Sequence, residues 1–195
     1  MSYLIIISAY LIGSLSTAII VCQLMGLTDP RTVGSKNPGA TNVLRIGGKK
    51  AAFFTLLGDV LKGLLPVLVA KQLGLDYEWL ILVGMAAFLG HLYPLYYGFK
   101  GGKGVATAIG VYLAIHFGAG LAVVATWLLI AKGFKISSLA ALISVVLSPL
   151  YFYAFTDSLN LSYGLLVMAL FIVWRHRSNI KNLIDGSESK IKADK

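Results

Sequence analysis

The chain has 195 residues, of which 57% are Ala, Val, Ile, Leu, Met, Phe, Trp, Tyr or Cys, a share above that of ordinary soluble domains. Its 17 Lys and Arg outnumber 8 Asp and Glu, and its single cysteine, Cys22, excludes an internal disulfide framework and a multi-cysteine metal site. The composition therefore predicts a basic protein that lies in a membrane. The N-terminal residues carry no basic segment and no cleavage site, so we expect a retained first span rather than a signal peptide.

Seven apolar runs follow one another, and each is a candidate membrane helix because a crossing takes roughly 20 apolar residues. The runs cover residues 3–25, 51–70, 79–97, 105–116, 119–131, 137–153 and 160–174. Residues 105–130 could instead form one long helix, unless the glycine-containing stretch 117–120 breaks it. The sequence thus predicts an all-α, polytopic helical membrane protein, with one integral membrane domain (1–176) and a basic cytoplasmic tail (177–195).

The positions of Lys and Arg favour seven spans over six. With seven, 15 of the 17 basic residues share one side, Lys71 lies on the other side, and Lys62 lies within a span. Six spans would place Lys132, Lys135 and the six basic residues from Arg175 onward outside, against the rule that cytoplasmic loops are rich in Lys and Arg. We therefore expect seven transmembrane helices with the N-terminus outside and the C-terminus inside. The basic charge is then mainly a topology signal, and no aromatic-rich basic face indicates a nucleic-acid partner.

The first polar segment with chemical potential is G-S-K-N-P-G-A-T-N-V-L-R, residues 34–45. Gly and Asn tolerate positive φ, so such a backbone can turn several N–H groups toward phosphate oxygens. Arg45 can add a bidentate clamp on the same anion. An ordinary turn-rich loop with a surface arginine is the alternative interpretation.

The second polar segment is G-F-K-G-G-K-G-V-A-T, residues 98–107, which leads into the fourth expected span. Its glycines admit the close approach of an anion, the following helix presents free N–H groups and a positive dipole end, and Lys103 adds a full charge. The spacing does not fit a Walker A loop, which disfavours nucleotide hydrolysis. Lysines that merely follow the positive-inside rule beside flexible glycines are the alternative.

The third polar segment is R-H-R-S-N-I, residues 175–180, after the last span. His176 and Asn179 are three residues apart and share a helix face. Arg177 fits a simple anchoring role at the membrane surface.

Within the spans, Asp59 and Lys62 also share a helix face, where an isolated charge would be costly. They form either a structural ion pair that orients the first and second segments or a direct contact with substrate, and the sequence leaves both open. His91 is expected to support the site from behind, and His116 to lie at the opposite membrane interface.

These segments together resemble the acyl-phosphate-dependent glycerol-3-phosphate acyltransferases, the PlsY family of bacterial phospholipid synthesis. The family pattern G-S-x-N-x-G-x-T-N with a following Arg is met by residues 34–45, although Lys36 stands where glycine is usual. Residues 98–107 match G-F-K-G-G-K-G-V-A-T, residues 175–180 match R-H-x-x-N-I, and residues 59–63 match D-x-x-K-G. The resemblance covers nearly the whole chain, and four motifs in the right order make it specific.

The resemblance implies that acyl phosphate is the acyl donor and glycerol 3-phosphate the acceptor, with 1-acyl-glycerol 3-phosphate (lysophosphatidic acid) and phosphate as products. It implies a site on the cytoplasmic face of the bacterial inner membrane, among membrane lipids, with no metal, no cofactor, no coenzyme A and no acyl carrier protein. The implied catalytic residues are Ser35, Arg45, Lys103, His176 and Asn179. The implied substrate-binding residues are Gly34, Asn37, Gly39, Asn42, Lys100, Gly101, Gly102, Gly104 and Thr107.

Acyl phosphate is a reactive mixed anhydride, so alignment of the substrates and positive donors supply much of the catalysis. The cytoplasmic segments contain no Cys–His or Ser–His–Asp grouping, which favours direct acyl transfer. The general base is either His176 or a phosphate of the substrate, and we favour the substrate.

Two other functions fit basic, glycine-rich segments in a membrane protein: a transporter of phosphorylated or other organic anions, and a lipid phosphatase. A transporter would carry inverted repeats and a site at the membrane midplane, and no convincing repeat relates the two halves of this sequence. A phosphatase would release phosphate without an acyl acceptor.

Overall fold

The computed structural model describes residues 2–191, and this part of the chain is helical without a β-strand, as predicted. Met1 and residues 192–195, which include Lys192 and Lys195 of the expected tail, lie outside the described residues. The chain forms two compact units, Met1–Ile115 and His116–Lys195. The boundary between them lies within the single membrane domain expected for residues 1–176, and the limits of that domain stay a prediction.

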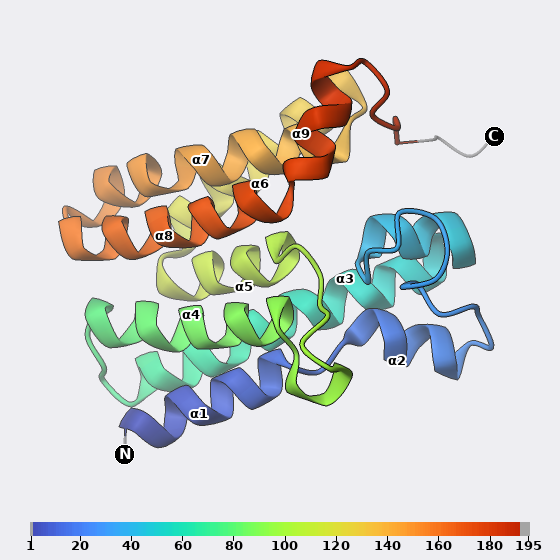
Figure 1. The fold of residues 1–195 in the computed structure, drawn as a ribbon. Helices are drawn as coiled ribbons and strands as arrows, with labels where there is room; N and C mark the ends of the chain where they lie inside the picture. The colour runs from blue at the N-terminus through green and yellow to red at the C-terminus, as the bar shows by residue number, and fades with distance from the viewer. Residues whose placement is uncertain (1, 192–195) are drawn as a thin grey trace. The chain divides into compact units, whose positions relative to one another are not determined.

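Unit 1 is built around α3, which packs against α1, α2, α4 and α5 (Figure 1). Its elements are α1 (Ser2–Gly13), α2 (Thr17–Leu24), α3 (Ala40–Gln72), α4 (Tyr77–Leu92), the 3₁₀ turn η1 (Leu95–Tyr97) and α5 (Val105–Ile115). Helices α3 and α5 meet through glycines, because a Cβ on Gly63 would lie 2.2 Å from the carbonyl oxygen of Thr107. A Cβ on Gly110 would likewise lie 2.1 Å from the carbonyl oxygen of Val60. Small residues at such crossings let membrane helices approach closely.

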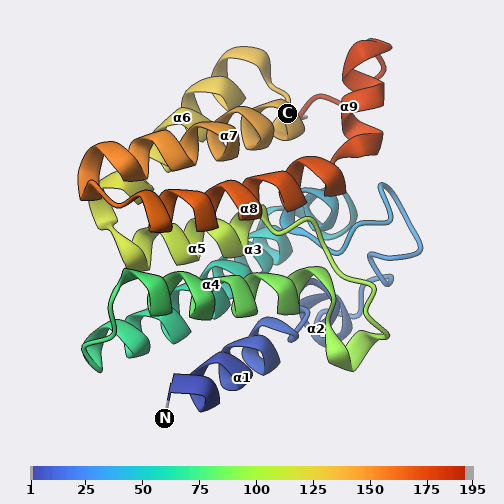
Figure 2. The same cartoon turned by 60° about the vertical axis from the view of Figure 1, so that its left-hand side comes forward.

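Unit 2 contains α6 (Phe117–Phe134), α7 (Ser137–Thr156), α8 (Leu159–Arg175) and α9 (Arg177–Ile184). Helix α7 packs against α6 and α8, and the three run side by side (Figure 2). The axis bends by 62° between α8 and α9, so α9 turns away from the bundle. No residue of α9 is buried.

The described helices give four stretches that are long and apolar enough to cross a membrane: α3, Tyr77–Tyr97, α6 and α7. Two bent pairs, α1 with α2 and α8 with α9, raise the number to six if each pair is one span. Helix α5 is apolar but has 11 residues, and its length of about 16 Å is shorter than the hydrocarbon core. Every expected apolar run is therefore helical, although not every run is a full-length span.

Residues 105–130 form two helices, and the break lies at His116 rather than within residues 117–120. The backbone of His116 is extended (φ −143°, ψ 109°), and its Nδ1 accepts the N–H of Ala119 at 3.2 Å, which caps α6. Gly118 and Gly120 lie inside α6. A capping side chain, not glycine flexibility, therefore ends one helix and begins the next.

Helix α3 begins at Ala40, well before the expected start at residue 51. Gly48, with φ 73° and ψ −171°, interrupts the helical backbone and separates a short first part from the long second part. Glycine adopts this left-handed φ without the clash that a Cβ would cause. Asn42 and Arg45 consequently lie on a short helical segment ahead of a kink, and not in a loop.

Candidate functional site

The first polar segment is held by Asn42, which lies in the first turn of α3. Its Oδ1 accepts the N–H of Ser35 at 2.9 Å, and its Nδ2 donates to the carbonyl oxygens of Pro30 (2.9 Å) and Val33 (3.1 Å). Asn42 is 1% exposed. Its amide is thus committed to the loop backbone, and this supports a loop-shaping role rather than direct contact with a substrate.

The same loop contains two left-handed residues, Gly34 (φ 60°) and Lys36 (φ 55°). A Cβ on Gly34 would lie 2.2 Å from Oδ1 of Asn42, so a side chain there would break the hydrogen bond that shapes the loop. A non-glycine residue pays about 1–2 kcal/mol to adopt such a φ. The conformation of Lys36 therefore gives a physical reason for the glycine that the family pattern has at this position.

Two predicted donors of this segment face solvent. Ser35 and Arg45 are exposed, and neither side chain makes a hydrogen bond within residues 2–191. Asn37 and Gly39 are half-buried in the turn before α3. The hydroxyl of Ser35 and the guanidinium of Arg45 are thus available to an anionic ligand.

Arg31, in the loop before this segment, is already engaged by Asp29. The closest pair is Nη2 to Oδ2 at 2.6 Å, and Nε adds contacts to both carboxylate oxygens at 3.0 and 3.1 Å. Hydrogen bonds from Arg31 hold the pKa of the Asp29 carboxyl below its ordinary value, and the same bonds raise the pKa of Arg31. The guanidinium of Arg31 is therefore paired with Asp29, whereas the guanidinium of Arg45, on the first part of α3, is exposed.

The second polar segment lies against the C-terminal end of α4. The N–H groups of Gly101 and Gly102 donate to the carbonyl oxygens of Leu92 and His91, both at 3.2 Å. Gly101 and Gly102 are buried, while Lys100 is exposed. Backbone hydrogen bonds thus anchor the glycines and leave a lysine at the surface.

The end of this segment leads directly into α5. Gly104 has φ 90°, and a Cβ there would lie 2.2 Å from Cε2 of Phe88, so both conformation and space require glycine. Helix α5 begins at Val105, and its free N–H groups and positive dipole end adjoin the half-buried Lys103. Thr107 is instead fully buried, with its carbonyl oxygen against Gly63 of α3. The anion-binding potential therefore lies before α5 rather than at Thr107.

Unit 1 brings the first and second segments into contact. A Cβ on Gly102 would lie 3.2 Å from the carbonyl oxygen of Pro38, so the glycine-rich segment touches the turn before α3. An electrostatic interaction with Tyr97 also contributes to the raised pKa of Arg31. In the two touching segments, Ser35, Arg45 and Lys100 are exposed and Lys103 is half-buried.

The third segment lies in unit 2, at the bend between α8 and α9. His176 is 4% exposed, and its Nδ1 lies 2.8 Å from the carbonyl oxygen of Ile172. Because a carbonyl only accepts, Nδ1 carries the proton and Nε2 is the acceptor of the neutral ring. The structure therefore fixes the tautomer of His176 through its own helix.

Asn179 is held by Glu188, a residue that the sequence motifs missed. Nδ2 of Asn179 donates to Oε1 of Glu188 at 2.7 Å, and Oγ of Ser138, at the start of α7, donates to the same oxygen at 2.7 Å. The N–H of Ile191 also donates to the carbonyl oxygen of Lys135 at 2.6 Å. The segment after α9 therefore folds back and ties α9 to the start of α7.

The buried side chains of unit 1 include a carboxylate, an ammonium group and an imidazole: Asp59 and Lys62 of α3, and His91 of α4. Nζ of Lys62 lies 2.8 Å from Oδ1 of Asp59 and donates to the carbonyl oxygen of Leu15 at 2.7 Å. Nδ1 of His91 lies 3.5 Å from the same carboxylate oxygen. These contacts form a closed cluster, and the backbone of His91 connects it to the glycine-rich segment.

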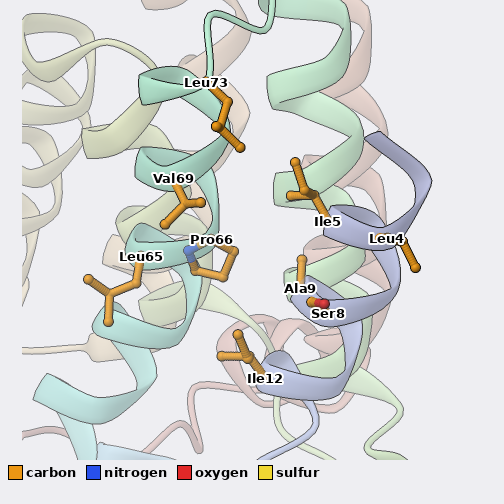
Figure 3. Close-up of a pocket in the computed structure, with 9 residues that line it drawn as sticks. All are labelled: Leu4, Ile5, Ser8, Ala9, Ile12, Leu65, Pro66, Val69 and Leu73. Atoms are coloured by element: carbon orange, nitrogen blue, oxygen red, sulfur yellow. The ribbon is translucent and has the colours of Figure 1, made fainter. Parts of the chain in front are cut away.

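An apolar groove of about 300 Å³ lies between α1 and α3 of unit 1 (Figure 3). Ile5, Ile12, Pro66 and Val69 are among its lining residues, and Ser8 is its one polar lining side chain. The groove contains no cation that could hold a phosphate. Its chemistry suits a hydrocarbon chain, and it is separate from the polar segments.

Residues 2–191 contain no group of three or more His, Cys, Asp or Glu side chains that could hold a metal ion. The cations and backbone donors described above are instead suited to phosphate, which Lys and Arg bind through charge and hydrogen bonds.

A family model described as glycerol-3-phosphate acyltransferase matches residues 3–186. The chain belongs to this family. A protein of that name from Thioalkalivibrio sulfidiphilus is 58% identical over 95% of this chain and 92% of its own, and one from Ruthia magnifica is 56% identical over 94% and 93%.

Solved structures agree with this assignment over the full chain. The glycerol 3-phosphate form of PlsY (YgiH), an integral membrane glycerol 3-phosphate acyltransferase, has a TM-score of 0.93 and 38% identity, and the match covers 98% of this chain and 96% of that one. The lysophosphatidic acid form of that protein has a TM-score of 0.90 at the same identity, over 97% and 94%. The resemblance that the sequence motifs indicated is thus confirmed.

Proposed function

We propose that this protein transfers a fatty acyl group from acyl phosphate to the 1-position of sn-glycerol 3-phosphate at the cytoplasmic face of a bacterial inner membrane. The observation that carries the proposal is the junction of the two glycine-bearing basic segments in unit 1, within a chain that belongs to the glycerol-3-phosphate acyltransferase family. Two phosphorylated substrates need cations and backbone donors, and this junction offers both. The proposed reaction needs no cofactor, coenzyme A or acyl carrier protein.

The proposed topology has seven spans, an outer N-terminus and an inner C-terminus. Within each unit the basic segments gather: those before α3 and before α5 meet in unit 1, and the segment after α9 contacts the α6–α7 turn in unit 2. This grouping fits the positive-inside rule. Reporter fusions after Trp174 test it, and an external signal there would contradict the seven-span arrangement.

In the proposed reaction, the 1-hydroxyl oxygen of glycerol 3-phosphate attacks the carbonyl carbon of acyl phosphate. A new ester C–O bond forms, the bond from that carbon to the phosphate oxygen breaks, and phosphate leaves with the electron pair. Arg45, Lys103 and the N–H groups before α5 would hold the phosphates and stabilise the developing negative charge. Ser35 and Asn179 would position the acceptor, while Gly101, Gly102 and Gly104 shape the anion cradle.

The proton of the attacking hydroxyl goes either to a phosphate of the substrate, which we favour, or to Nε2 of His176. Because Nδ1 of His176 donates to Ile172, Nε2 is the ring nitrogen that would take the proton if His176 were the base. His176→Gln separates the two: substrate-assisted transfer predicts that KM for glycerol 3-phosphate rises more than kcat falls. A fall in kcat of roughly a hundredfold or more, with substrate affinity intact, would make His176 the base.

The deciding experiment incubates purified protein with acyl phosphate, with and without glycerol 3-phosphate, and follows the lipid product and released phosphate. We expect 1-acyl-glycerol 3-phosphate and phosphate in equal amounts, only when the acceptor is present. Phosphate release without acceptor would instead indicate a phosphatase. Uptake of organic anions into vesicles, without product formation, would indicate a transporter.

A further inference from the structure

Asp59, Lys62 and His91 are 2%, 5% and 6% exposed, so all three are sealed inside the helices of unit 1. Burial of charge in a membrane protein is costly unless each group has partners. Buried charged groups in a membrane protein therefore indicate a structural or functional role.

Lys62 is the charged centre of the cluster, and its contacts point inward. Its ammonium group forms an ion pair with Asp59 and donates a hydrogen bond to the carbonyl oxygen of Leu15 between α1 and α2. Leu15 lies where the helical backbone is broken, because α1 ends at Gly13 and α2 begins at Thr17. Lys62 is thus buried, and both of these contacts are with the scaffold.

His91 connects this cluster to the glycine-rich segment from two sides. Its Nδ1 faces Asp59 at 3.5 Å, while its backbone carbonyl accepts the N–H of Gly102 at 3.2 Å. The far edge of the ring also abuts Gly102, because a Cβ there would lie 2.2 Å from Nε2 and 2.9 Å from Cε1. The imidazole ring is therefore packed directly against Gly102.

We propose that His91 is a positioning residue for the phosphate-binding segment before α5, and that Asp59 and Lys62 hold His91 in place. The inference rests on the proposed function, because it assigns one of the two phosphorylated substrates to the segment supported by His91. The ring fixes the position of Gly102 between α4 and the turn at Pro38, and so positions Lys103, the next residue. Displacement of a binding group by about 1 Å can cost a hundredfold in rate.

The test variant is His91→Asn, which keeps a polar group near Asp59 but removes the ring edge that contacts Gly102. Steady-state kinetics measure KM for both substrates, kcat, and thermal stability in detergent. We expect KM for one substrate to rise roughly tenfold or more, with kcat changed less than about threefold. Gly102→Ala should raise KM for the same substrate, because both changes displace the same backbone.

Lys71→Met is the matched control for the cluster, because Lys71 lies on α3, as Lys62 does. Its Nζ also donates to backbone carbonyls, those of Ala114 (3.2 Å) and Ile115 (3.0 Å). This control should lower thermal stability without a selective change in either KM. Should His91→Asn not fold, the double variant Asp59→Asn/Lys62→Met removes both charges together and leaves no unpaired buried charge. It should raise KM for the same substrate as Gly102→Ala.

The inference is overturned if His91→Asn leaves both KM values unchanged, or changes the KM that Gly102→Ala does not. It is also overturned if both KM values shift only in step with stability, as any loosened scaffold would give. A wild-type protein that cleaves acyl phosphate without acyl transfer would contradict the proposed function instead.

Discussion

The two regions that carry the predicted catalytic residues are held in different ways. In unit 1 the glycine-rich segment rests on buried polar side chains of the membrane helices, through His91 and the cluster behind it. In unit 2 the segment with His176 and Asn179 lies on a short helix without buried residues, and a glutamate from the chain after that helix holds it. The first segment is thus supported by buried side chains, and the second is held by hydrogen bonds to the chain that follows α9.

The difference teaches where each region is sensitive. A segment supported from inside depends on residues far away in the sequence, and small residues are needed where it touches its support. A segment tied from outside depends on a few surface hydrogen bonds, and loss of one partner releases the helix. Substitutions in the two regions should therefore fail differently, with selective effects on substrate binding in unit 1 and combined effects on activity and helix order in unit 2.

The largest effect is expected from Lys103→Ala in unit 1, which should lower acyl transfer by at least about a hundredfold while the protein stays folded. The compact charge beside the first turn of α5 has no substitute in alanine. Lys132→Ala is a control, because that lysine shares the expected cytoplasmic side but not the site. Near-normal turnover of the Lys103 variant would reduce this lysine to a topology signal.

The next effect tests the exposed donor of the first segment. Arg45→Lys keeps the charge but loses the planar fork that binds two oxygens at once. We expect kcat/KM to fall roughly tenfold, since a bidentate contact becomes a single one. The result that contradicts the clamp is a variant with unchanged KM for both substrates and unchanged kcat.

A third change tests the tie in unit 2. Glu188→Ala removes the shared acceptor of Asn179 and Ser138, and we expect activity and thermal stability to fall together, with activity lowered roughly tenfold. Glu188→Gln keeps one acceptor and should lose less. Asp185→Ala is a control acid close by in the sequence. If the Asp185 and Glu188 variants behaved alike, the effect would be one of surface charge and not of the tie.

The smallest effect concerns the Asp29–Arg31 pair, far from the buried cluster. Because the pKa of Asp29 is lowered in the folded protein, the pair stabilises the fold above the ordinary carboxyl value of about 4 and ceases to do so as the pH falls through the folded value. Both side chains are partly exposed, so the contribution should be under about 1 kcal/mol. Wild type should exceed Asp29→Asn in thermal stability at pH 7, and the gap should narrow toward pH 3.

The sequence predicted what depends on local pattern. Apolar runs gave the helices, and the motif order gave the family, because both signals lie in neighbouring residues. The structure adds that the first two polar segments touch, through the contact of Gly102 with Pro38.

Other features depend on partners distant in the chain, and no local pattern revealed them. The family motif implies that Asn42 binds substrate, yet its amide is hydrogen-bonded to the loop backbone. Glu188 lies in a tail without a pattern, and only the fold brings it to Asn179. The early start of α3 was missed because the glycine at its kink usually argues against a helix, although Gly48 here joins two helical parts.

The contact between Lys62 and Leu15 has a consequence for biosynthesis. A broken helix in lipid leaves backbone carbonyls without partners, and each one costs several kcal/mol. Leu15 emerges from the ribosome 47 residues before Lys62, the side chain that satisfies its carbonyl. The carbonyl of Leu15 therefore gains this partner only after α3 has entered the membrane. Site-specific crosslinks between α1 and α3 in nascent chains of increasing length would date this step, and we expect them to appear only once Lys62 has been inserted.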